Sequence, residues 1–503
     1  MKTNTLEFDA QALREKILDL AMRGKLVPQD PNDEPASVLL KKIKAEKEKL
    51  IKEKKIKKSK PLAPISDNEK PFDIPDSWEW VRLGDAANFI GTGMVVPSSQ
   101  QYKDLEDETM IPYFKMNNIG NWNGEFDLTN IVYIKKNEKV DKYLISSDEL
   151  LFNTRNSREL VGKTTVVPTI NKRIVANNNI LRITTFGNIQ TKFLNYILIS
   201  PYGKNLFFNL TTATTNVAAI YQKQLREIMI PLPPLEEQSR IAAKIAQLFA
   251  LLRKVESSTQ QYAKLQTLLK SKVLDWAMRG KLVEQNPHDE PASVLLEKIK
   301  AEKEQLVKEG KIKNSKSLPS ITDDEKPFDI PDSWEWVRLG DIGAITSGGT
   351  PKTSEKSYWI NGTIPWITPA VMAKCKDQMI FNSESVKRIN NLGLEKSSAH
   401  LIPRNSLVVS SRAPIGYVNI VPFEYTTNQG CKSVSLYKDI NEEFIYFALK
   451  NSVSDMNNRA SGTTFKEISG TKFSQTIIPL PPLKEQTKIS QKIRVLATII
   501  HNF

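Results

Sequence analysis

The sequence predicts an α+β chain in which two mixed α/β domains are separated by a pair of long antiparallel helices with pseudo-twofold symmetry. Three observations support this fold class: an internal duplication, a heptad seam of apolar residues, and a second copy of that seam divided between the two chain ends. A repeat that is cut inside one element and closed by the termini is a circularly permuted repeat. The fold expectation therefore depends on the repeats more than on local propensity.

The duplication encloses two unlike inserts. Residues 19–85 recur at 275–341, and only 14 of the 67 positions differ. A second repeat pairs IPLPPLEEQSRIAAKI with IPLPPLKEQTKISQKI, beginning at residues 230 and 478. Between the repeats lie two segments that resemble each other only in scattered places: 86–229 and 342–477. The pattern predicts one frame used twice, with a different domain inserted each time.

The first long helix is predicted from a sustained heptad pattern. Alternating spacings of four and three residues connect these positions: Ile241, Ile245, Leu248, Leu252, Val255, Thr259, Tyr262, Gln266, Leu269, Val273 and Trp276. Pro233 and Pro234 precede the helix, and Gly280 is a suitable stop. Thirty-six helical residues would extend about 54 Å. Taken alone, such a stripe is more typical of core packing than of a specific function.

The second long helix is predicted in two pieces. The seam recurs near the C-terminus as Ile489, Ile493, Leu496 and Ile500, and continues near the N-terminus as Ala10, Leu13, Ile17 and Leu20. We therefore expect the termini to meet and the completed helix to pack antiparallel on 235–279. The helix could be completed within this chain or by a neighbouring copy.

Each insert alternates β-forming residues with polar turns. In the first, 111–134 and 150–167 are predicted to form strands with polar tips, and in the second, 407–421 and 426–436. The tips carry Asn, Gln, Ser, Lys and Arg, the residue types that bind base edges: Arg pairs with guanine, and Asn or Gln with adenine. Ordinary turn chemistry explains the same composition equally simply.

Positive charge is unevenly distributed. Lys and Arg number 71 against 57 Asp and Glu, which gives a net charge of +14. Residues 41–60 contribute +8 and residues 296–316 contribute +3, and both stretches resemble a solvated helix followed by a linker. The two stretches that contain the inserts are nearly neutral: 71–230 has 17 basic and 16 acidic residues, and 327–478 has 16 basic and 14 acidic residues. Charge therefore favours an anionic partner only mildly and does not locate a site.

Signals for metal binding and catalysis are poor. Cys375 and Cys431 cannot form a disulfide framework or a four-ligand zinc site, and the three histidines are dispersed. Ser157–Thr164 approaches a phosphate-binding loop, but Ser157 replaces the first glycine and a strand follows instead of a helix. We predict no metal site and no catalytic residues. With no apolar leader or long apolar run, a reduced cytoplasmic protein is expected.

Taken together, the motifs resemble those of specificity (S) subunits of type I restriction–modification systems. The resemblance covers essentially the whole chain. It is carried by PDSWEWVRLGD, IPLPPLEEQ with IPLPPLKEQ, AMRGKLV twice, GTIPWITP, SSRAPIGYV and TNQG. In that family, two target-recognition domains held apart by conserved helices each read one half of a bipartite, asymmetric DNA site.

The resemblance also implies partners and cofactors. Two methyltransferase (M) subunits would bind the conserved regions and use S-adenosylmethionine to methylate adenine at N6. Restriction (R) subunits would add ATP- and Mg²⁺-dependent translocation and cleavage. This chain itself would need no cofactor, would be a non-catalytic subunit, and would bind double-stranded DNA without a membrane.

The family pattern is carried over to strand-tip positions in both inserts. In the first we expect these residues near DNA: Lys115, Asn117, Asn118, Thr154, Arg155, Asn156 and Arg158. In the second we expect Thr368, Ser410, Ser411, Arg412, Asn428, Gln429 and Lys432. Arg155 and Arg412 are the preferred base readers.

The expected organisation has five parts. They are an N-terminal helical region and Lys-rich linker (1–70), target-recognition domain 1 (71–230), a central helical spacer and linker (231–326), target-recognition domain 2 (327–478) and a C-terminal helix (479–503). The main alternative is a coiled-coil scaffold whose inserts bind proteins. A self-sufficient DNA enzyme is disfavoured by the missing motifs.

Overall fold

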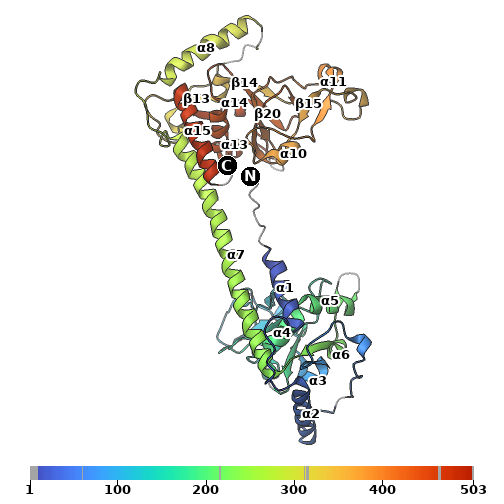
Figure 1. Cartoon of the computed structure of the whole chain (residues 1–503). Helices are drawn as coiled ribbons and strands as arrows, with labels where there is room; N and C mark the ends of the chain where they lie inside the picture. The colour runs from blue at the N-terminus through green and yellow to red at the C-terminus, as the bar shows by residue number, and fades with distance from the viewer. Residues whose placement is uncertain are drawn as a thin grey trace. The chain divides into compact units, whose positions relative to one another are not determined.

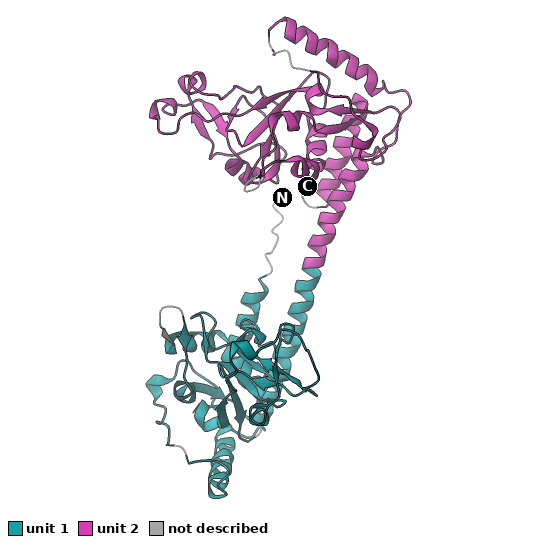
Figure 2. Ribbon diagram, turned by 180° about the vertical axis from the view of Figure 1, so that it is seen from behind, with its two compact units in different colours: residues 1–259 teal, residues 260–503 magenta. Residues whose placement is uncertain are grey.

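A computed structural model of the chain describes residues 9–58, 60–187, 189–213, 217–310, 312, 317–462 and 466–500 (Figure 1). The chain forms two compact units, residues 1–259 and residues 260–503 (Figure 2). Each unit contains one copy of the repeated frame and one insert. The α+β expectation is confirmed in both units.

The described residues of unit 1 form four sheets, and its insert is built mainly on two of them. The larger has the strand order β2-β9-β5-β7 and the smaller the order β4-β3-β8. The strands are β2 (Ala87–Thr92), β3 (Met110–Phe114), β4 (Val132–Lys135), β5 (Leu150–Asn153), β7 (Thr164–Val166), β8 (Val175–Ala176) and β9 (Ile180–Thr185). The predicted strands in 111–134 and 150–167 are therefore confirmed.

Unit 2 repeats this topology although its insert has a different sequence. Its sheets have the orders β14-β20-β17-β18 and β16-β15-β19. The strands are β14 (Gly343–Ser347), β15 (Ile364–Ile367), β16 (Lys387–Ile389), β17 (Ser406–Ser411), β18 (Ile415–Val421), β19 (Thr426–Thr427) and β20 (Cys431–Leu436). The two inserts are thus versions of one fold, which the sequence comparison alone did not establish.

The larger sheet of each unit separates two apolar cores. In β17, Leu407 and Val409 face one core while Val408 faces the other, as the two-residue period of a strand requires. In β5 the side chains of Leu150 and Phe152 alternate with Leu151 in the same way. The first core of each unit includes helical residues. The helices are α4 (Thr191–Ile199) and α5 (Pro201–Leu210) in unit 1, and α12 (Glu442–Asn451) and α13 (Val453–Arg459) in unit 2.

The two repeated sequence blocks pair with each other. In unit 1, β1 (Glu79–Arg82) lies antiparallel to β12 (Met229–Leu232). In unit 2, β13 (Glu335–Arg338) pairs in the same register with β21 (Ile477–Leu480). Each PDSWEW block therefore meets the IPLPPL block of its own unit, so the start and the end of each insert lie side by side.

A buried carboxylate joins each paired block to a long helix. In unit 1 the Trp78 indole donates to Glu237 Oε2 at 2.9 Å, and Gln29 Nε2 donates to Oε1 at 2.6 Å. In unit 2 the Trp334 indole donates to Glu485 Oε2 at 3.0 Å. Burial raises the pKa of both carboxyl groups despite these donors. The tryptophan blocks are thus packing elements.

The raised pKa of Glu237 predicts a pH-dependent stability. Because the folded protein holds this proton more tightly than the unfolded chain, the associated stability is present below the ordinary pKa of 4.5 and is lost as the pH rises through the folded value. We expect Glu237→Gln to gain stability relative to the unmodified protein between pH 4 and pH 8. Thermal unfolding midpoints across this range test it, with the exposed neighbour Glu236→Gln as control. A difference independent of pH would contradict the prediction.

The central helix occupies nearly the whole of the predicted range 235–279. α7 (Leu235–Met278) has 44 residues and begins directly after Pro233 and Pro234, as predicted. It ends before Gly280, whose φ of +67° is the left-handed conformation that favours glycine. The thirty-six residues of the seam begin only at Ile241. The helix starts earlier, and Glu236 and Glu237 in its first turn favour the helix N-terminus.

The heptad seam of α7 is buried only near its ends. Ile241, Ile245 and Leu252 lie in the core of unit 1, and Val273 lies in the core of unit 2. The side chains of the seam between Val255 and Leu269 are exposed or half-buried among the described residues. Heptad spacing predicted the helix correctly, but it did not indicate where the seam is covered.

The second seam is present as two separate helices. α1 (Ala10–Met22) belongs to unit 1, where Arg14 forms an ion pair with Glu256 of α7. α15 (Leu483–Ile499) belongs to unit 2, where the Ile500 carbonyl accepts a hydrogen bond from Gln266 of α7. Residues 1–8 and 501–503, which would complete the helix, lie outside the described residues. Joining of the termini therefore stays a prediction.

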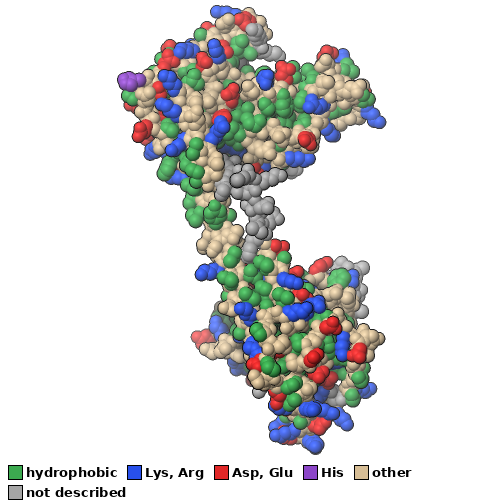
Figure 3. All heavy atoms as spheres, in the orientation of Figure 1, with side chains coloured by type: hydrophobic (Ala, Val, Ile, Leu, Met, Phe, Trp, Pro, Cys, Tyr) green, Lys and Arg blue, Asp and Glu red, His purple; other side chains and the backbone are tan. Residues whose placement is uncertain are grey.

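The two Lys-rich stretches begin as helices. They are α2 (Ala36–Lys52) and α8 (Ala292–Lys308). Each buries residues only in its first two turns, among them Ile43 and Ile299. Lys and Arg side chains gather over α2, whereas both signs of charge are mixed over the rest of the visible face (Figure 3). The expectation of a solvated helix in both stretches is confirmed.

Candidate nucleic-acid interface

The polar tips of three strands meet at one place in unit 2. The Asn428 backbone N–H donates to the Ile367 carbonyl at 3.0 Å, which joins the segment after β19 to the end of β15. The Ser411 N–H donates to the Gly430 carbonyl at 2.8 Å, which adds the end of β17. These bonds hold the three tips together independently of their side chains.

The same backbone frame exists in unit 1. The Asn177 N–H donates to the Phe114 carbonyl at 2.8 Å, and the Thr154 N–H donates to the Asn179 carbonyl at 2.8 Å. In both units an asparagine stabilises the turn, since Asn177 Oδ1 accepts from Asn179 N–H and Asn428 Oδ1 accepts from Gly430 N–H. We call this arrangement the tip frame.

The tip frames define equivalent positions without a sequence alignment. Strand register and hydrogen bonds match five pairs: Lys115 with Thr368, Thr154 with Ser411, Arg155 with Arg412, Asn177 with Asn428, and Leu181 with Lys432. A further segment completes each frame, because Arg155 pairs with Ala219 and Arg412 pairs with Glu467. Arginine and asparagine are therefore shared between the two frames, while the other three matched positions differ.

In unit 1 the frame brings together Lys115, Thr154 and Arg155. Lys115 follows β3 and donates through Nζ to Gln101 at 2.8 Å. The Thr154 hydroxyl donates to the Asn179 carbonyl at 3.0 Å. Arg155 is exposed, and within the described chain its guanidinium has no acidic partner. Of these three residues, Arg155 is exposed, whereas Lys115 and Thr154 are half-buried.

The other expected residues of unit 1 are less uniform. Asn117 is exposed, but Asn118 is buried and its Oδ1 accepts from the Lys115 N–H at 2.9 Å. Asn156 Nδ2 donates to Asn153 Oδ1, which stabilises the turn. Arg158 lies over the Phe208 ring of α5, 4.1 Å from its centre, outside the tip frame. The frame therefore does not include Arg158.

In unit 2, Ser410 and Ser411 are buried. The Ser410 hydroxyl donates to the Pro414 carbonyl and accepts from the Tyr417 N–H, both at 2.8 Å. Ser411 Oγ accepts from Lys432 Nζ at 3.3 Å. Thr368 caps the short helix α10 (Pro369–Met372), accepting from the Val371 N–H. All three hydroxyl groups are hydrogen-bonded within the protein, where they help to position the tips. They are therefore not free groups that simply face a ligand.

The remaining residues of unit 2 form a charged cluster. Arg412 contacts Glu467 at 3.4 Å, and Lys432 contacts the other oxygen of the same carboxylate at 3.5 Å. Lys432 is buried and also donates to the Gln429 carbonyl at 2.9 Å. Gln429 is exposed, and its side-chain oxygen accepts from Thr350.

Sequence reasoning missed four residues of the frames. Asn177, Asn178 and Asn179 occupy in unit 1 the positions of Asn428, Gln429 and Gly430, and the polar run between two β-forming segments could have indicated them. Glu467 gave no local signal because its strand partner, Arg412, lies 55 residues earlier in the chain.

Two glycines outside the polar tips allow the frames to close. A Cβ on Gly93 would lie 2.2 Å from the Ala176 carbonyl oxygen, and one on Gly348 would lie 1.9 Å from the Asn428 carbonyl oxygen. Their role is close approach between backbones, which a residue with a Cβ would prevent.

The structure gives no geometry for nucleophilic or phosphate-loop chemistry at the tips. Burial raises the pKa of the Cys431 thiol to about 12, so it stays protonated at neutral pH. Lys163 points inward and donates to the Ile119 carbonyl at 2.7 Å, and β7 begins at Thr164 where a helix would be required. In the part of the chain that is described, no three His, Cys, Asp or Glu side chains could together hold a metal ion.

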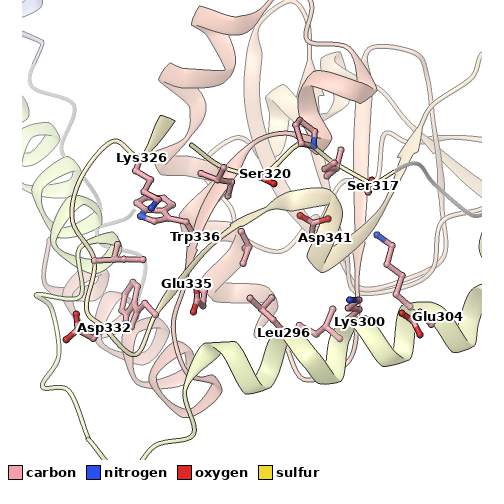
Figure 4. Close-up of a pocket in the computed structure, with 18 of the residues that line it drawn as sticks. Leu296, Lys300, Glu304, Ser317, Ser320, Lys326, Asp332, Glu335, Trp336 and Asp341 are labelled. Atoms are coloured by element: carbon pink, nitrogen blue, oxygen red, sulfur yellow. The ribbon is translucent and has the colours of Figure 1, made fainter. Parts of the chain in front are cut away.

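A groove of about 1030 Å³ lies in unit 2 between α8 and the segment that includes β13 (Figure 4). Leu296 and Val307 of α8 and Trp336 of β13 contribute apolar side chains to its lining, and Lys300, Glu304 and Asp332 add charges. Burial raises the pKa of Asp341. Of its 21 lining residues, only four differ from their counterparts 256 positions earlier: Val307, Ser317, Pro319 and Ser320. The groove thus belongs to the repeated frame and is remote in sequence from the tips.

Comparison with known families identifies the chain. The family model described as type I restriction modification DNA specificity domain matches residues 75–266 and 331–502, most of both units. The chain belongs to this family, and it is a type I specificity subunit, the non-catalytic member that supplies DNA recognition. Both matched stretches contain a tip frame. None of these similarities favours the scaffold alternative.

Individual relatives agree. The chain is 31% identical to the EcoAI specificity subunit of Escherichia coli, covering 97% of this chain and 88% of that protein. It is 35% identical to the EcoEI specificity subunit of Escherichia coli over 69% of this chain and 64% of that protein. A solved structure from work on complex assembly and conformational transition of the type I R-M system matches with a TM-score of 0.55 and 21% identity, covering 86% and 92%; this supports the fold. Within the described residues, no helix is long and apolar enough to cross a membrane.

Proposed function

We propose that each tip frame reads one half of a bipartite, asymmetric DNA site. The observation that carries this proposal is one backbone frame with two different sets of side chains. Arg155 and Arg412 occupy equivalent positions, whereas Leu181 and Ala219 are replaced by Lys432 and Glu467. A constant frame with different polar groups is what two readers of unlike sequences require.

The predicted DNA-contacting residues divide into two groups within this proposal. Arg155, Arg412, Gln429, Asn117 and Lys115 would contact DNA directly, because they are exposed or half-buried and, within the described residues, their side chains are not hydrogen-bonded to the backbone of the tips. Asn118, Asn156, Thr154, Thr368, Ser410, Ser411, Asn428 and Lys432 would instead hold the tips in place. Arg158 would contact phosphate. α7, which contributes residues to both units, would set the spacing between half-sites.

The lining of the groove in unit 2, whose sequence recurs almost unchanged in unit 1, supports a proposal about partners. Selection for different DNA sequences allows the two inserts to diverge, whereas binding of two copies of one partner would keep the two frames similar. We therefore assign the groove beside α8, and the corresponding residues beside α2, to two methyltransferase subunits. S-Adenosylmethionine would be bound by those subunits, and ATP with Mg²⁺ by restriction subunits, in a cytoplasmic complex. Five domain segments with the boundaries given above remain part of this proposal.

The groove assignment predicts the effect of a single charge. We expect Val307→Asp to lower the affinity of the chain for the methyltransferase subunit about tenfold or more, because an unpaired carboxylate would be buried at the contact. Titration followed by analytical ultracentrifugation measures the loss. Ala301→Asp is the matched control, since Ala301 is exposed on the same helix and does not line the groove. Equal binding by both variants would contradict the assignment.

DNA binding itself is expected to depend on the partner. Because the inserts are nearly neutral, this chain alone should bind DNA weakly, and the partner should supply much of the phosphate contact. Measured against salt concentration, log Kd should change more steeply for the complex with methyltransferase than for the isolated chain. Equal affinities and equal slopes would count against the proposal.

A further inference from the structure

The charged cluster of unit 2 contains a carboxylate where a DNA-binding surface would ordinarily avoid one. Glu467 is fixed from both sides: its strand pairs with Arg412, and its backbone exchanges hydrogen bonds with Ser461 at 2.9 and 3.0 Å. The Arg412 side chain retains 42% of its surface and Glu467 retains 36%. Both groups therefore face outward while they contact each other.

The contacts leave hydrogen-bonding capacity on the carboxylate. Oε2 of Glu467 contacts Arg412 at 3.4 Å and Oε1 contacts Lys432 at 3.5 Å. Charge-assisted N–H···O bonds are normally about 2.7–2.9 Å long, so neither contact is a tight bond. Each carboxylate oxygen can accept about two hydrogen bonds. Glu467 can thus accept from a ligand without losing its present partners.

Folding does not require this charged pair. In unit 1 the same frame closes with Leu181 in place of Lys432 and Ala219 in place of Glu467. Glu467 is half-buried, and ion pairs that are partly open to solvent contribute little to stability. Lys432 and Glu467 are both present in unit 2 and both replaced in unit 1, so we treat them as one functional pair. Their presence in unit 2 needs a reason other than stability.

We propose that Glu467 is a specificity-determining residue, paired with Arg412 as acceptor and donor toward a G·C base pair. Arg412 would bind guanine O6 and N7, and Glu467 would accept from the cytosine 4-amino group. Arg412 and Lys432 together outweigh the carboxylate, so the cluster keeps a net charge of +1 beside the DNA. A carboxylate also repels the acceptor atoms that guanine and thymine present at that position. This inference rests on the proposed reading of DNA by unit 2.

The test compares variants in the complex with methyltransferase, using selection from a randomised duplex pool. Glu467→Gln keeps one of the two oxygens, which can accept from Arg412 or from Lys432, and replaces the other with an amide donor. We expect it to shift preference from cytosine toward adenine at one position of the second half-site. Glu467→Ala combined with Lys432→Leu reproduces the apolar pair of unit 1 and avoids an unpaired buried lysine. It should lose about 5- to 150-fold of discrimination at that same position.

The first half-site serves as the internal control, because unit 1 reads it and should select the same bases in every variant. If both variants keep the original preference at every position, Glu467 only supports the frame and the inference is overturned. If the unmodified complex selects no sequence at all, the proposed function fails, and this inference fails with it.

Discussion

Trp334→Ala is expected to lower the free energy of unfolding of unit 2 by about 3–5 kcal/mol, the range for removal of a large aromatic side chain from a core. Trp334 is 3% exposed, and its ring lies edge-on to Phe444 at 6.4 Å. Alanine would leave a cavity, and it would also remove the indole donor from the buried Glu485 carboxylate. Both losses fall on the connection between the frame and the helix α15.

The measurement must separate the units, because a chain with two compact units does not unfold in one step. Amide hydrogen exchange in β13, β21 and α12 reports the opening free energy of unit 2, and exchange in β1 and β12 reports unit 1. Trp78→Ala is the matched control and should weaken unit 1 instead. Trp334→Phe, which keeps the ring but not the N–H donor, should cost about 1–3 kcal/mol. A loss below about 1 kcal/mol for Trp334→Ala would contradict the packing argument.

Arg412→Ala is expected to relax recognition at one base pair of the second half-site by about 1–3 kcal/mol, and Arg155→Ala should do the same in the first half-site. The two arginines occupy equivalent places on the tip frames and are exposed or partly exposed. Loss of a bidentate donor pair removes discrimination at the base it reads, while contacts to phosphate persist.

Selection from a randomised duplex pool by the complex gives the preference at each position, and a titration gives the overall affinity. Arg158→Ala is the control in unit 1, because Arg158 lies over Phe208 outside the tip frame. It should weaken binding about equally for all sequences. If Arg412→Ala and Arg155→Ala also reduce binding uniformly, they contact phosphate and base reading must be assigned to other tip residues.

The fold was predictable to the extent that repeats and periodicity determine it. Proline and glycine at 233, 234 and 280 delimited α7, and alternating residues in 407–421 indicated β17 and β18. The shared topology of the inserts was not predictable, because it depends on backbone pairing while the tip residues differ. Which residues of the heptad seam are buried was also not predictable, because the spacing does not indicate which element packs against them.

The location of the candidate site was predictable, but the orientation of its side chains was predictable only in part. Arg155 and Arg412 lie on the tip frames, as their position after a strand indicated. Ser410 and Asn118 are turned inward, because a polar residue in a turn has the same sequence signature whether it faces solvent or backbone. Glu467 depends on a contact across 55 residues of chain, which no local pattern reports.

The strand pairs β1–β12 and β13–β21, which begin and end the inserts, have a consequence for the evolution of such chains. Arg82 pairs with Met229 and Arg338 pairs with Ile477. Each insert therefore begins and ends at neighbouring points of the frame. The loop-closure cost of a longer or shorter intervening segment rises only slowly with its length. Exchanging or lengthening an insert would therefore leave the structure of the groove and of α7 unchanged. A cell could acquire a new recognition half while every partner continues to bind the same unaltered surface.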